Sequence, residues 1–476
     1  MTAPRLWGAP HSACVGLSTR LSDTVQYMTP TVVRARRAYV YLISAVAALA
    51  GLLFGFDTAV INGALPFLRD EFRLTDFQVE LVAGALLVGC IFGAGLAGIV
   101  TDRLGRRRAL ISAAVLFAAA SVASALPREL IGLAMARFAA GIAIGLGSVL
   151  APMYIAEIAP PHRRGRLVSV NQLAIVTGIL AAYYVNWQLS FAGRGNWRWM
   201  FAVAAVPSVA FWLGLLFIPE SPRWLAAKRD EADALAVLTR VVSPEEAERE
   251  LREIRTSLAE EAGATLADLF RPGLRRALIV AVVLAILCQI TGINTIIYYG
   301  SILLREHAGQ NASSAIGANV LIGAVNFIGT ILAMATIDHA GRRALLLWGA
   351  AGMGVSLGVL GLAFRNPSPS FPLIVALILA YVFSFSVSFG PGVWVYISEI
   401  FPNAVRARAM SIGTMTIWIS CLAVTLTFLT LVHLLGTAGA FWFYAALCAV
   451  AFVFVLLALP ETKGRTLEDI QRLWEK

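Results

Sequence analysis

The chain has 476 residues, of which 59% are hydrophobic and only 14% are charged, and its mean hydropathy is +0.76. Soluble domains carry about 25% charged residues, so this composition excludes a soluble protein and indicates a membrane protein with many spans. The net charge of +10 does not point to nucleic acid, because the arginines gather in short loops between apolar segments. The five cysteines have no paired spacing and support neither a disulfide framework nor a zinc site.

Twelve apolar segments follow one another along the chain, each long enough to cross about 30 Å of hydrocarbon. They lie at residues 39–63, 79–100, 109–126, 130–157, 167–190, 197–218, 276–299, 313–337, 343–364, 371–399, 407–433 and 437–459. In the tenth segment, Gly390-Pro391-Gly392 predicts a break in the helix. The predicted fold is an all-α membrane protein with twelve transmembrane helices.

The spans form two groups of six, separated by one long polar stretch. We expect an N-terminal segment, a six-helix bundle, a helical linker, a second six-helix bundle and a C-terminal tail at residues 1–38, 39–218, 219–275, 276–459 and 460–476. Within the linker, Ser243 followed by Pro244 and Glu246 predicts a helix start that is capped by Ser243. The N-terminal segment has no clear signal peptide, and translation could begin at Met1 or at Met28.

Three motifs recur in the same order in both groups of spans. They are Asp102-Arg103-Leu104-Gly105-Arg106-Arg107 with Asp338-His339-Ala340-Gly341-Arg342-Arg343, Glu157 before Arg164 with Glu399 before Arg406, and Pro219-Glu220-Ser221 with Pro460-Glu461-Thr462. A parallel repeat of six spans is one architecture of transporters that rock two halves around a central site. The loops that carry these motifs hold most of the loop arginines, so the positive-inside rule places them, the linker and both termini in the cytoplasm.

Polar side chains inside the spans mark a candidate binding site near the bilayer midplane, where polar groups are costly. The amides of Gln and Asn both donate and accept hydrogen bonds and therefore match a ligand with several hydroxyl groups, while aromatic faces pack on its C–H groups. The candidates are Gln172, Gln289, Asn294, Tyr298, Asn326 and Trp394. For any single amide, a hydrogen bond between helices is the alternative role.

Two charges also lie inside spans, Asp57 in the first and Arg137 in the fourth. Either one alone would cost about 3 kcal/mol or more at the centre of a helix in the membrane. They therefore predict either a proton-binding site or a static structural ion pair.

The chain resembles the sugar porter family of the major facilitator superfamily from about Tyr39 to Arg472. The segments that carry the resemblance are Gly105-Arg106-Arg107, Pro152-Met153-Tyr154-Ile155-Ala156-Glu157, Pro219-Glu220-Ser221-Pro222-Arg223-Trp224-Leu225 and Pro460-Glu461-Thr462-Lys463-Gly464. The resemblance implies import of a monosaccharide or related polyol with protons, by alternating access, in the cell membrane. We expect this to be a bacterial inner membrane. We expect a monomer in the lipid bilayer that acts as no enzyme, binds no nucleic acid or metal, and needs no cofactor beyond the proton gradient.

The resemblance also implies roles for particular residues. It gives Gln172, Gln289, Asn294, Asn326 and Trp394 as sugar ligands, Phe54 and Tyr298 as apolar walls, and Trp418 as the match of a family tryptophan. Asp57 and Arg137 stand where proton-coupled members have an acid and an arginine. A cytoplasmic gate, closed in the outward-facing state, would comprise Arg106, Arg107, Glu157, Arg164, Asp338, Arg342, Glu399 and Arg406. The alternative for these arginines is a role as topology signals alone.

Three positions depart from the family pattern, because Cys288, Ile417 and Cys421 stand where polar side chains are usual. Each lost hydrogen bond is worth about 0.5–1.5 kcal/mol, which favours a less hydroxylated or unusual sugar over glucose. Two other functions remain open for the chain, an uncoupled sugar facilitator and a sugar sensor that does not transport.

Overall fold

The computed structural model describes residues 30–160, 163–193, 195–228, 230–263, 266–271, 274–307, 311–366 and 370–463. The regular elements there are helices: α1 (Pro30–Phe72), α2 (Asp76–Leu104), α3 (Arg106–Ala125), α4 (Leu130–Ile158), α5 (Arg164–Leu189), α6 (Asn196–Ala202), α7 (Ala205–Leu215), α8 (Pro222–Ala227), α9 (Glu231–Val241), α10 (Pro244–Gly263), the 3-10 helix η2 (Leu266–Phe270), α11 (Leu274–Ile290), α12 (Ile293–His307), α13 (Ala312–Ala340), α14 (Arg342–Phe364), α15 (Phe371–Val387), α16 (Phe389–Glu399) and α17 (Asn403–Ala458).

Within the described part of the chain, eleven helical stretches are long and apolar enough to cross a membrane. The last of them turns at Gly436, whose φ of 70° and ψ of 164° are not helical, so α17 contains two spans. The predicted all-α protein with twelve transmembrane helices is therefore confirmed. The chain is a multi-pass membrane protein.

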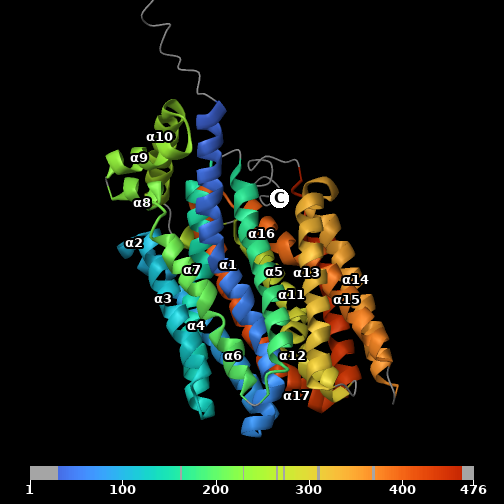
Figure 1. The fold of residues 1–476 in the computed structure, drawn as a ribbon. Coiled ribbons are helices and arrows are strands. Elements are labelled where there is room, and N and C mark those ends of the chain that lie inside the picture. The colour runs from blue at the N-terminus through green and yellow to red at the C-terminus, as the bar shows by residue number, and fades with distance from the viewer. Residues whose placement is uncertain are drawn as a thin grey trace, which may run out of the picture.

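The linker helices lie together at one end of the bundle, while the long helices run side by side (Figure 1). We call this end the linker side and the opposite end the far side, and we call α1–α7 the first half and α11–α17 the second half. The predicted start of the longest linker helix is confirmed, because α10 begins at Pro244 and the N–H of Glu246 donates to the Ser243 hydroxyl at 3.2 Å.

Two spans are interrupted by short non-helical turns. The break in span ten was predicted at Gly390-Pro391-Gly392, but it lies at Ser388 (φ −123°, ψ −83°), between α15 and α16. Pro391 falls in the first turn of α16, where its missing N–H costs little, so the proline follows the break. The break in span seven was not predicted. There Gly292, with φ of 95°, separates α11 from α12.

Helix α1 runs from Pro30 to Phe72, beyond both ends of the predicted span 39–63. Its backbone lies directly against α5, since a Cβ at Gly55 would come within 1.8 Å of the Ile175 carbonyl oxygen. Helices α2 and α4 meet in the same way, since a Cβ at Gly141 would come within 2.0 Å of the Leu86 carbonyl oxygen. Glycines let neighbouring helices in a membrane approach closely enough for backbone packing, which fixes α1 against α5 within the first half.

This packing predicts the effect of two glycine substitutions. Gly55→Ala should destabilise the fold by about 1–3 kcal/mol or more, because its methyl group would overlap the backbone of α5. Gly98→Ala is the matched control, because no atom lies within 4 Å of the position of its added Cβ. The measurement is the thermal unfolding midpoint of the purified variants in detergent. Equal midpoints for the two variants would contradict the packing.

Candidate functional site

The two charges predicted inside spans lie together in the first half. Arg137 Nη1 of α4 is 2.8 Å from Asp57 Oδ2 of α1, and Arg137 Nη2 donates to the Asp57 carbonyl oxygen at 3.4 Å. The side chain of Arg137 is completely buried, and its guanidinium carbon lies 5.2 Å from the centre of the Phe201 ring. Each charge therefore has its compensating partner away from water, as burial requires.

A polar cluster from the second half surrounds the break between α11 and α12. Asn294 Nδ2 donates to Gln289 Oε1 and also to Cys421 Sγ, at 3.1 Å. The Tyr298 hydroxyl lies 3.6 Å from the same sulfur. Gln289, Asn294, Tyr298 and Cys421 are all buried. Both amide hydrogens of Asn294 are thus engaged, and its Oδ1 remains as the acceptor for a ligand.

Aromatic side chains from the two halves meet beside this cluster. The rings of Phe54 in α1 and Trp418 in α17 are 5.2 Å apart and tilted. Trp418 is buried, and its Nε1 has no hydrogen-bond partner. Phe54 precedes Asp57 by three residues, so α1 carries an aromatic contact of this site and the buried carboxylate within one turn.

Three predicted sugar ligands stand apart from the hydrogen-bonded cluster. Gln172 on α5 and Trp394 on α16 are half-buried, and Asn326 on α13 is buried. Within the described residues, no hydrogen bond links any of the three to the cluster, so their side-chain hydrogen-bonding groups stay available to a ligand.

The three departures from the family pattern occupy different surroundings. Cys421 contacts two predicted ligands, Asn294 and Tyr298, whereas Cys288 Sγ lies 3.9 Å from the carbonyl oxygen of Phe389, at the break in span ten. Ile417 is buried next to Trp418 in the sequence. Cys421 is therefore the departure that directly touches the candidate site.

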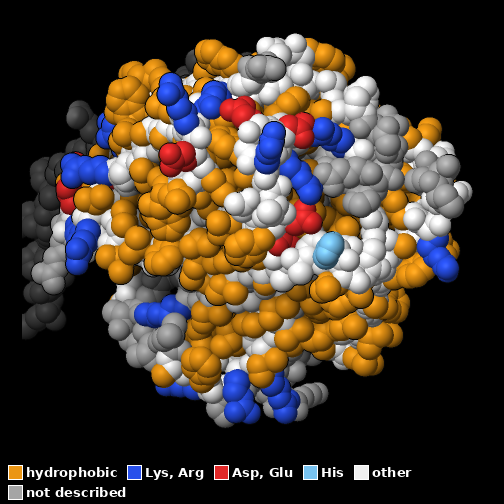
Figure 2. Space-filling view, turned by 90° about the horizontal axis from the view of Figure 1, so that it is seen from below, with side chains coloured by type: hydrophobic (Ala, Val, Ile, Leu, Met, Phe, Trp, Pro, Cys, Tyr) orange, Lys and Arg blue, Asp and Glu red, His pale blue; other side chains and the backbone are white. Residues whose placement is uncertain are grey.

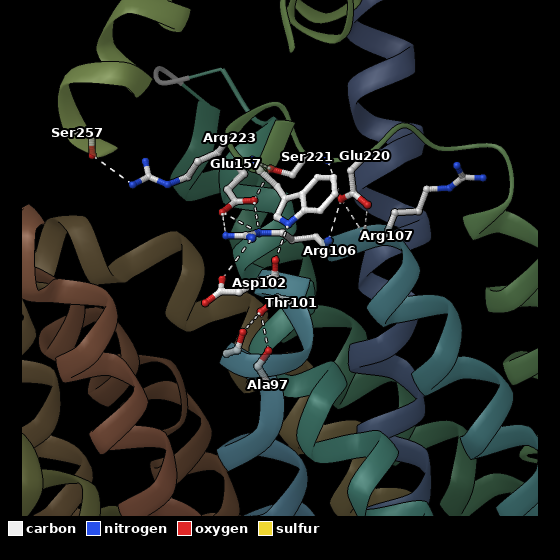
Figure 3. Close-up of polar contacts among 12 residues, drawn as sticks. Ala97, Thr101, Asp102, Arg106, Arg107, Glu157, Glu220, Ser221, Arg223 and Ser257 are labelled. Atoms are coloured by element: carbon white, nitrogen blue, oxygen red, sulfur yellow. Dashed lines mark hydrogen bonds and ion pairs between the residues drawn. The ribbon is translucent and has the colours of Figure 1, made fainter. Parts of the chain in front are cut away.

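On the linker side, the first half holds the end of α4 against the start of α3. The Arg106 guanidinium is 3.1 Å from Glu157 Oε1, and Glu157 also accepts from the Ser221 hydroxyl (Figure 3). Glu220 accepts from the backbone N–H groups of Arg106 and Arg107 at 2.8 and 3.0 Å and so caps α3. Gly105, with φ of 89°, permits this close approach of the glutamate.

The second half repeats this arrangement at the equivalent residues. Arg342 Nη2 lies 2.8 Å from Glu399 Oε1, and Glu399 accepts from the Thr462 hydroxyl at 2.7 Å. Glu461 accepts from the N–H groups of Arg342 and Arg343, both at 3.0 Å. The sequence repeat is thus a repeat of contacts. The two capping glutamates were not assigned as site residues, although their recurrence was the available signal.

The other predicted gate residues have different partners. Arg107 donates to the Leu215 carbonyl at 2.8 Å, and Arg406 donates to the Phe401 carbonyl at 3.0 Å. Arg164 lies 3.8 Å from Glu250 of the linker helix α10. The side chain of Asp338 lies outside the described residues. The contacts of Arg106 and Glu157 stay within the first half and its connection to the linker, so the closure of a gate between halves stays a prediction.

The far side contains contacts that join the two halves. Asn62 of α1 donates to the Ile297 carbonyl of α12 at 2.8 Å and accepts from the Ser301 hydroxyl. Arg305 of α12 lies 2.9 Å from Asp70 of α1. Figure 2 views this side and shows acidic and basic side chains next to one another on a largely hydrophobic face.

A buried carboxylate on the far side was also missed by the sequence analysis. Glu80 of α2 is 1% exposed and binds the backbone of α17. The available signal was its position, because it is a charge inside the predicted span 79–100.

A membrane protein with two repeated six-span halves and a polar cluster where they meet is a secondary transporter by its architecture. Residues 43–474 match the family described as "Sugar (and other) transporter". The chain belongs to this sugar transporter family.

Named relatives match along nearly the whole chain. It is 41% identical over 445 residues to the arabinose-proton symporter of Bacillus subtilis (strain 168), covering 92% of this chain and 96% of that protein. It is 38% identical over 444 residues to the galactose-proton symporter of Escherichia coli (strain K12), covering 92% and 95%. A partially occluded inward-open structure of the xylose transporter XylE from E. coli matches with a TM-score of 0.80 at 33% identity, over 90% of this chain and 100% of that one.

Glu250 supplies a pH-dependent contact between the linker and the bundle. Its side chain is buried, and this burial raises the pKa of the Glu250 carboxyl from its ordinary value to about 7, against the opposing effect of Arg164. Burial and the charge of Arg164 also lower the pKa of Arg406. A carboxyl whose pKa is raised in the folded protein stabilises the docking of α10 on the bundle at pH values below its ordinary pKa. This contribution is lost as the pH rises to the raised pKa.

Docking of α10 should therefore weaken as the pH rises from the ordinary pKa of 4.5 to about 7, and Glu250→Gln should abolish this dependence. The measurement is hydrogen exchange of peptides within Pro244–Gly263, corrected for the intrinsic pH dependence of exchange. Glu248→Gln is the matched control, because Glu248 is 64% exposed on the same helix and should keep the wild-type response. The same pH response in Glu250→Gln as in the wild type would exclude Glu250 as its source.

Proposed function

We propose that this protein imports a monosaccharide or related polyol together with protons, by alternating access. The observation that carries the proposal is the buried pair of Asp57 and Arg137, whose nearest charged atoms are 2.8 Å apart. Membership of the sugar transporter family and the names of the arabinose and galactose symporters support the sugar and the proton. The energy source is the proton gradient, with no other cofactor, and the working unit is a monomer in the lipid bilayer rather than an enzyme.

The linker side faces the cytoplasm of a bacterial cell, with both termini there, and the described conformation faces inward. The arginine-rich loops on the linker side support this orientation. Hydrogen bonds between the halves on the far side, such as those of Asn62 and Glu80, support closure towards the outside. In the opposite state the linker-side arginines and glutamates, with Arg164 and Arg406, would close the cytoplasmic gate.

The proton binds Asp57 in this mechanism. Protonation removes the negative charge that compensates Arg137, and the guanidinium then has to find another partner or another position. Asp57 lies on the same helix as Phe54, which contacts Trp418. A shift of α1 would therefore move Phe54 relative to Trp418 at the sugar site. Proton binding and sugar binding would thereby favour the same rearrangement of the two halves.

The sugar binds where the two halves meet. Asn294 Oδ1 accepts a hydrogen bond from a sugar hydroxyl, since both hydrogens of the Asn294 amide are donated to Gln289 and Cys421. Trp418 supplies an aromatic face and a free indole N–H. Gln172, Asn326 and Trp394 complete the site with side chains that have no hydrogen bond to the cluster in the described part of the chain.

Asp57→Asn should abolish concentrative uptake and leave counterflow exchange, which needs no net proton movement. One charge crossing 100 mV is worth about 2.3 kcal/mol, so the wild type should accumulate sugar roughly 50-fold from the potential alone. The measurement is sugar-dependent alkalinisation of a lightly buffered cell suspension, together with the ratio of internal to external labelled sugar, with and without an uncoupler. Asp76→Asn is the control, because Asp76 pairs with Arg69 in its own half.

The outcomes separate the proposal from its alternatives. Alkalinisation that persists in Asp57→Asn would leave Asp57 as a structural partner of Arg137 and move the proton elsewhere. A wild type that equilibrates sugar without accumulation would be a facilitator, and one that moves no sugar at all would be a sensor.

Cys421→Asn should broaden the sugars accepted and lower the Michaelis constant for hexoses about 2- to 10-fold, since one restored hydrogen bond is worth about 0.5–1.5 kcal/mol. The measurement is competition of labelled-sugar uptake by a panel of pentoses, hexoses and polyols. Cys288→Gln is the control, because Cys288 contacts the Phe389 carbonyl rather than Asn294. If Cys288→Gln broadened the range of accepted sugars and Cys421→Asn did not, Cys288 rather than Cys421 would be the position that contacts the sugar.

A further inference from the structure

Glu80 of α2 makes a buried contact with the opposite half of the molecule. Its Oε1 accepts hydrogen bonds from the backbone N–H groups of Leu429 and Thr430 in α17, at 2.7 and 3.1 Å. Its Oε2 accepts from the Thr430 hydroxyl at 3.2 Å. The carboxylate therefore has three donors, all from a single turn of a helix in the second half.

These donors are unusual because they lie inside a long helix. In a regular α-helix the N–H of residue 429 donates to the carbonyl of residue 425, and this carbonyl keeps a second lone pair for a donor from another helix. Here the Thr425 carbonyl accepts from the Tyr299 hydroxyl of α12 at 2.8 Å, while the Leu429 N–H donates to Glu80. Side chains from both halves thus bind the backbone of this one turn of α17.

This turn lies on the same helix as the candidate sugar site. Cys421, Thr425 and Leu429 follow one another at intervals of four residues and therefore occupy one face of α17. Cys421 contacts Asn294, Thr425 contacts Tyr299, and Leu429 contacts Glu80. The face that carries the sugar-site thiol is held, two turns further on, by the carboxylate of the first half.

We propose that Glu80 is the positioning residue through which the first half holds α17 on the far side, and that this contact must break before the sugar site opens there. Glu80 belongs to the first half and all three of its donors to the second, so separation of the halves at this end removes every partner of the carboxylate. The contact is available in only one of the two states and therefore biases the equilibrium between them.

The inference rests on the proposed alternating access, but it can be tested without knowledge of the sugar or of proton coupling. Glu80→Gln keeps the shape of the side chain but removes the charge from the acceptor of the two N–H groups. It also replaces the oxygen that accepts from the Thr430 hydroxyl with an NH₂ group, which cannot accept. Asp76→Asn is the matched control, since Asp76 lies one turn away on the same helix and pairs with Arg69 of its own half. The measurement is hydrogen–deuterium exchange of the full-length purified proteins, followed by mass spectrometry.

The expected result is a reciprocal change in exchange. Peptides on the far side, including residues 426–433 of α17 and 76–84 of α2, should exchange roughly tenfold faster in Glu80→Gln, because charge-assisted hydrogen bonds are lost. Peptides on the linker side, around Arg106 and Arg342, should exchange more slowly, because the population moves towards the state that closes there. Asp76→Asn should match the wild type at both ends.

The reciprocity distinguishes positioning from simple stabilisation. Faster exchange on the far side without slower exchange on the linker side would mean that Glu80 only stabilises the fold, and the proposal would be wrong. Unchanged exchange at both ends would overturn it equally. If Glu80→Gln fails to accumulate, the shorter carboxylate of Glu80→Asp provides the same readout under the same criterion. Failure of sugar uptake by the wild type would instead reject the proposed function while leaving this result interpretable.

Discussion

Backbone groups inside the hydrocarbon of a membrane must find partners within the protein, because no water is present to take them. The second half breaks its helices in spans seven and ten and satisfies the exposed groups with side chains. The Tyr381 hydroxyl donates to the Thr291 carbonyl at the break in span seven, at 2.9 Å. The Cys288 thiol lies against the Phe389 carbonyl at the break in span ten. Within α17, Glu80 accepts from the N–H groups of Leu429 and Thr430.

The same requirement explains where the halves contact each other on the far side. Asn62 donates to the carbonyls of Ile296 and Ile297 in α12, at 3.2 and 2.8 Å, and the Tyr183 hydroxyl donates to the Ile297 carbonyl at 3.1 Å. These first-half side chains bind backbone atoms of the second half, and Asn62 also bonds the Ser301 and Asn319 side chains. A contact of this kind depends on the position of a helix more than on the identity of the residue it reaches. The linker side differs, since its pairs of Arg106 with Glu157 and Arg342 with Glu399 join side chains within one half.

The sequence predicts the fold well because its signals are local. Twelve apolar stretches and a repeated set of loop motifs need no knowledge of the packing between helices, and the cap at Ser243 depends on three neighbouring residues. The break at Gly292 was not predicted, because glycine is frequent in membrane helices and does not by itself indicate a break. The residue that stabilises the turn, Tyr381, also lies far along the chain. The different surroundings of Cys288 and Cys421 were also not predicted, because the composition of a span does not reveal which way each of its side chains points.

Helix α1 links the parts of the molecule that coupling would have to connect. Within nine residues, which span about 12 Å of helix, it places Phe54 against Trp418, Asp57 against Arg137 and Asn62 against α12. Two of these contacts reach the second half, and the third is the buried ion pair of the first half. Close packing of Gly55 on the α5 backbone leaves α1 little room to bend independently of its own half. A change in the charge of Asp57 can therefore act on the sugar site only by moving α1 together with α5, or by turning α1 about this contact. Either movement strains the bonds of Asn62 on the far side, so on the proposed mechanism the proton site and the closure of the far side share one mechanical element.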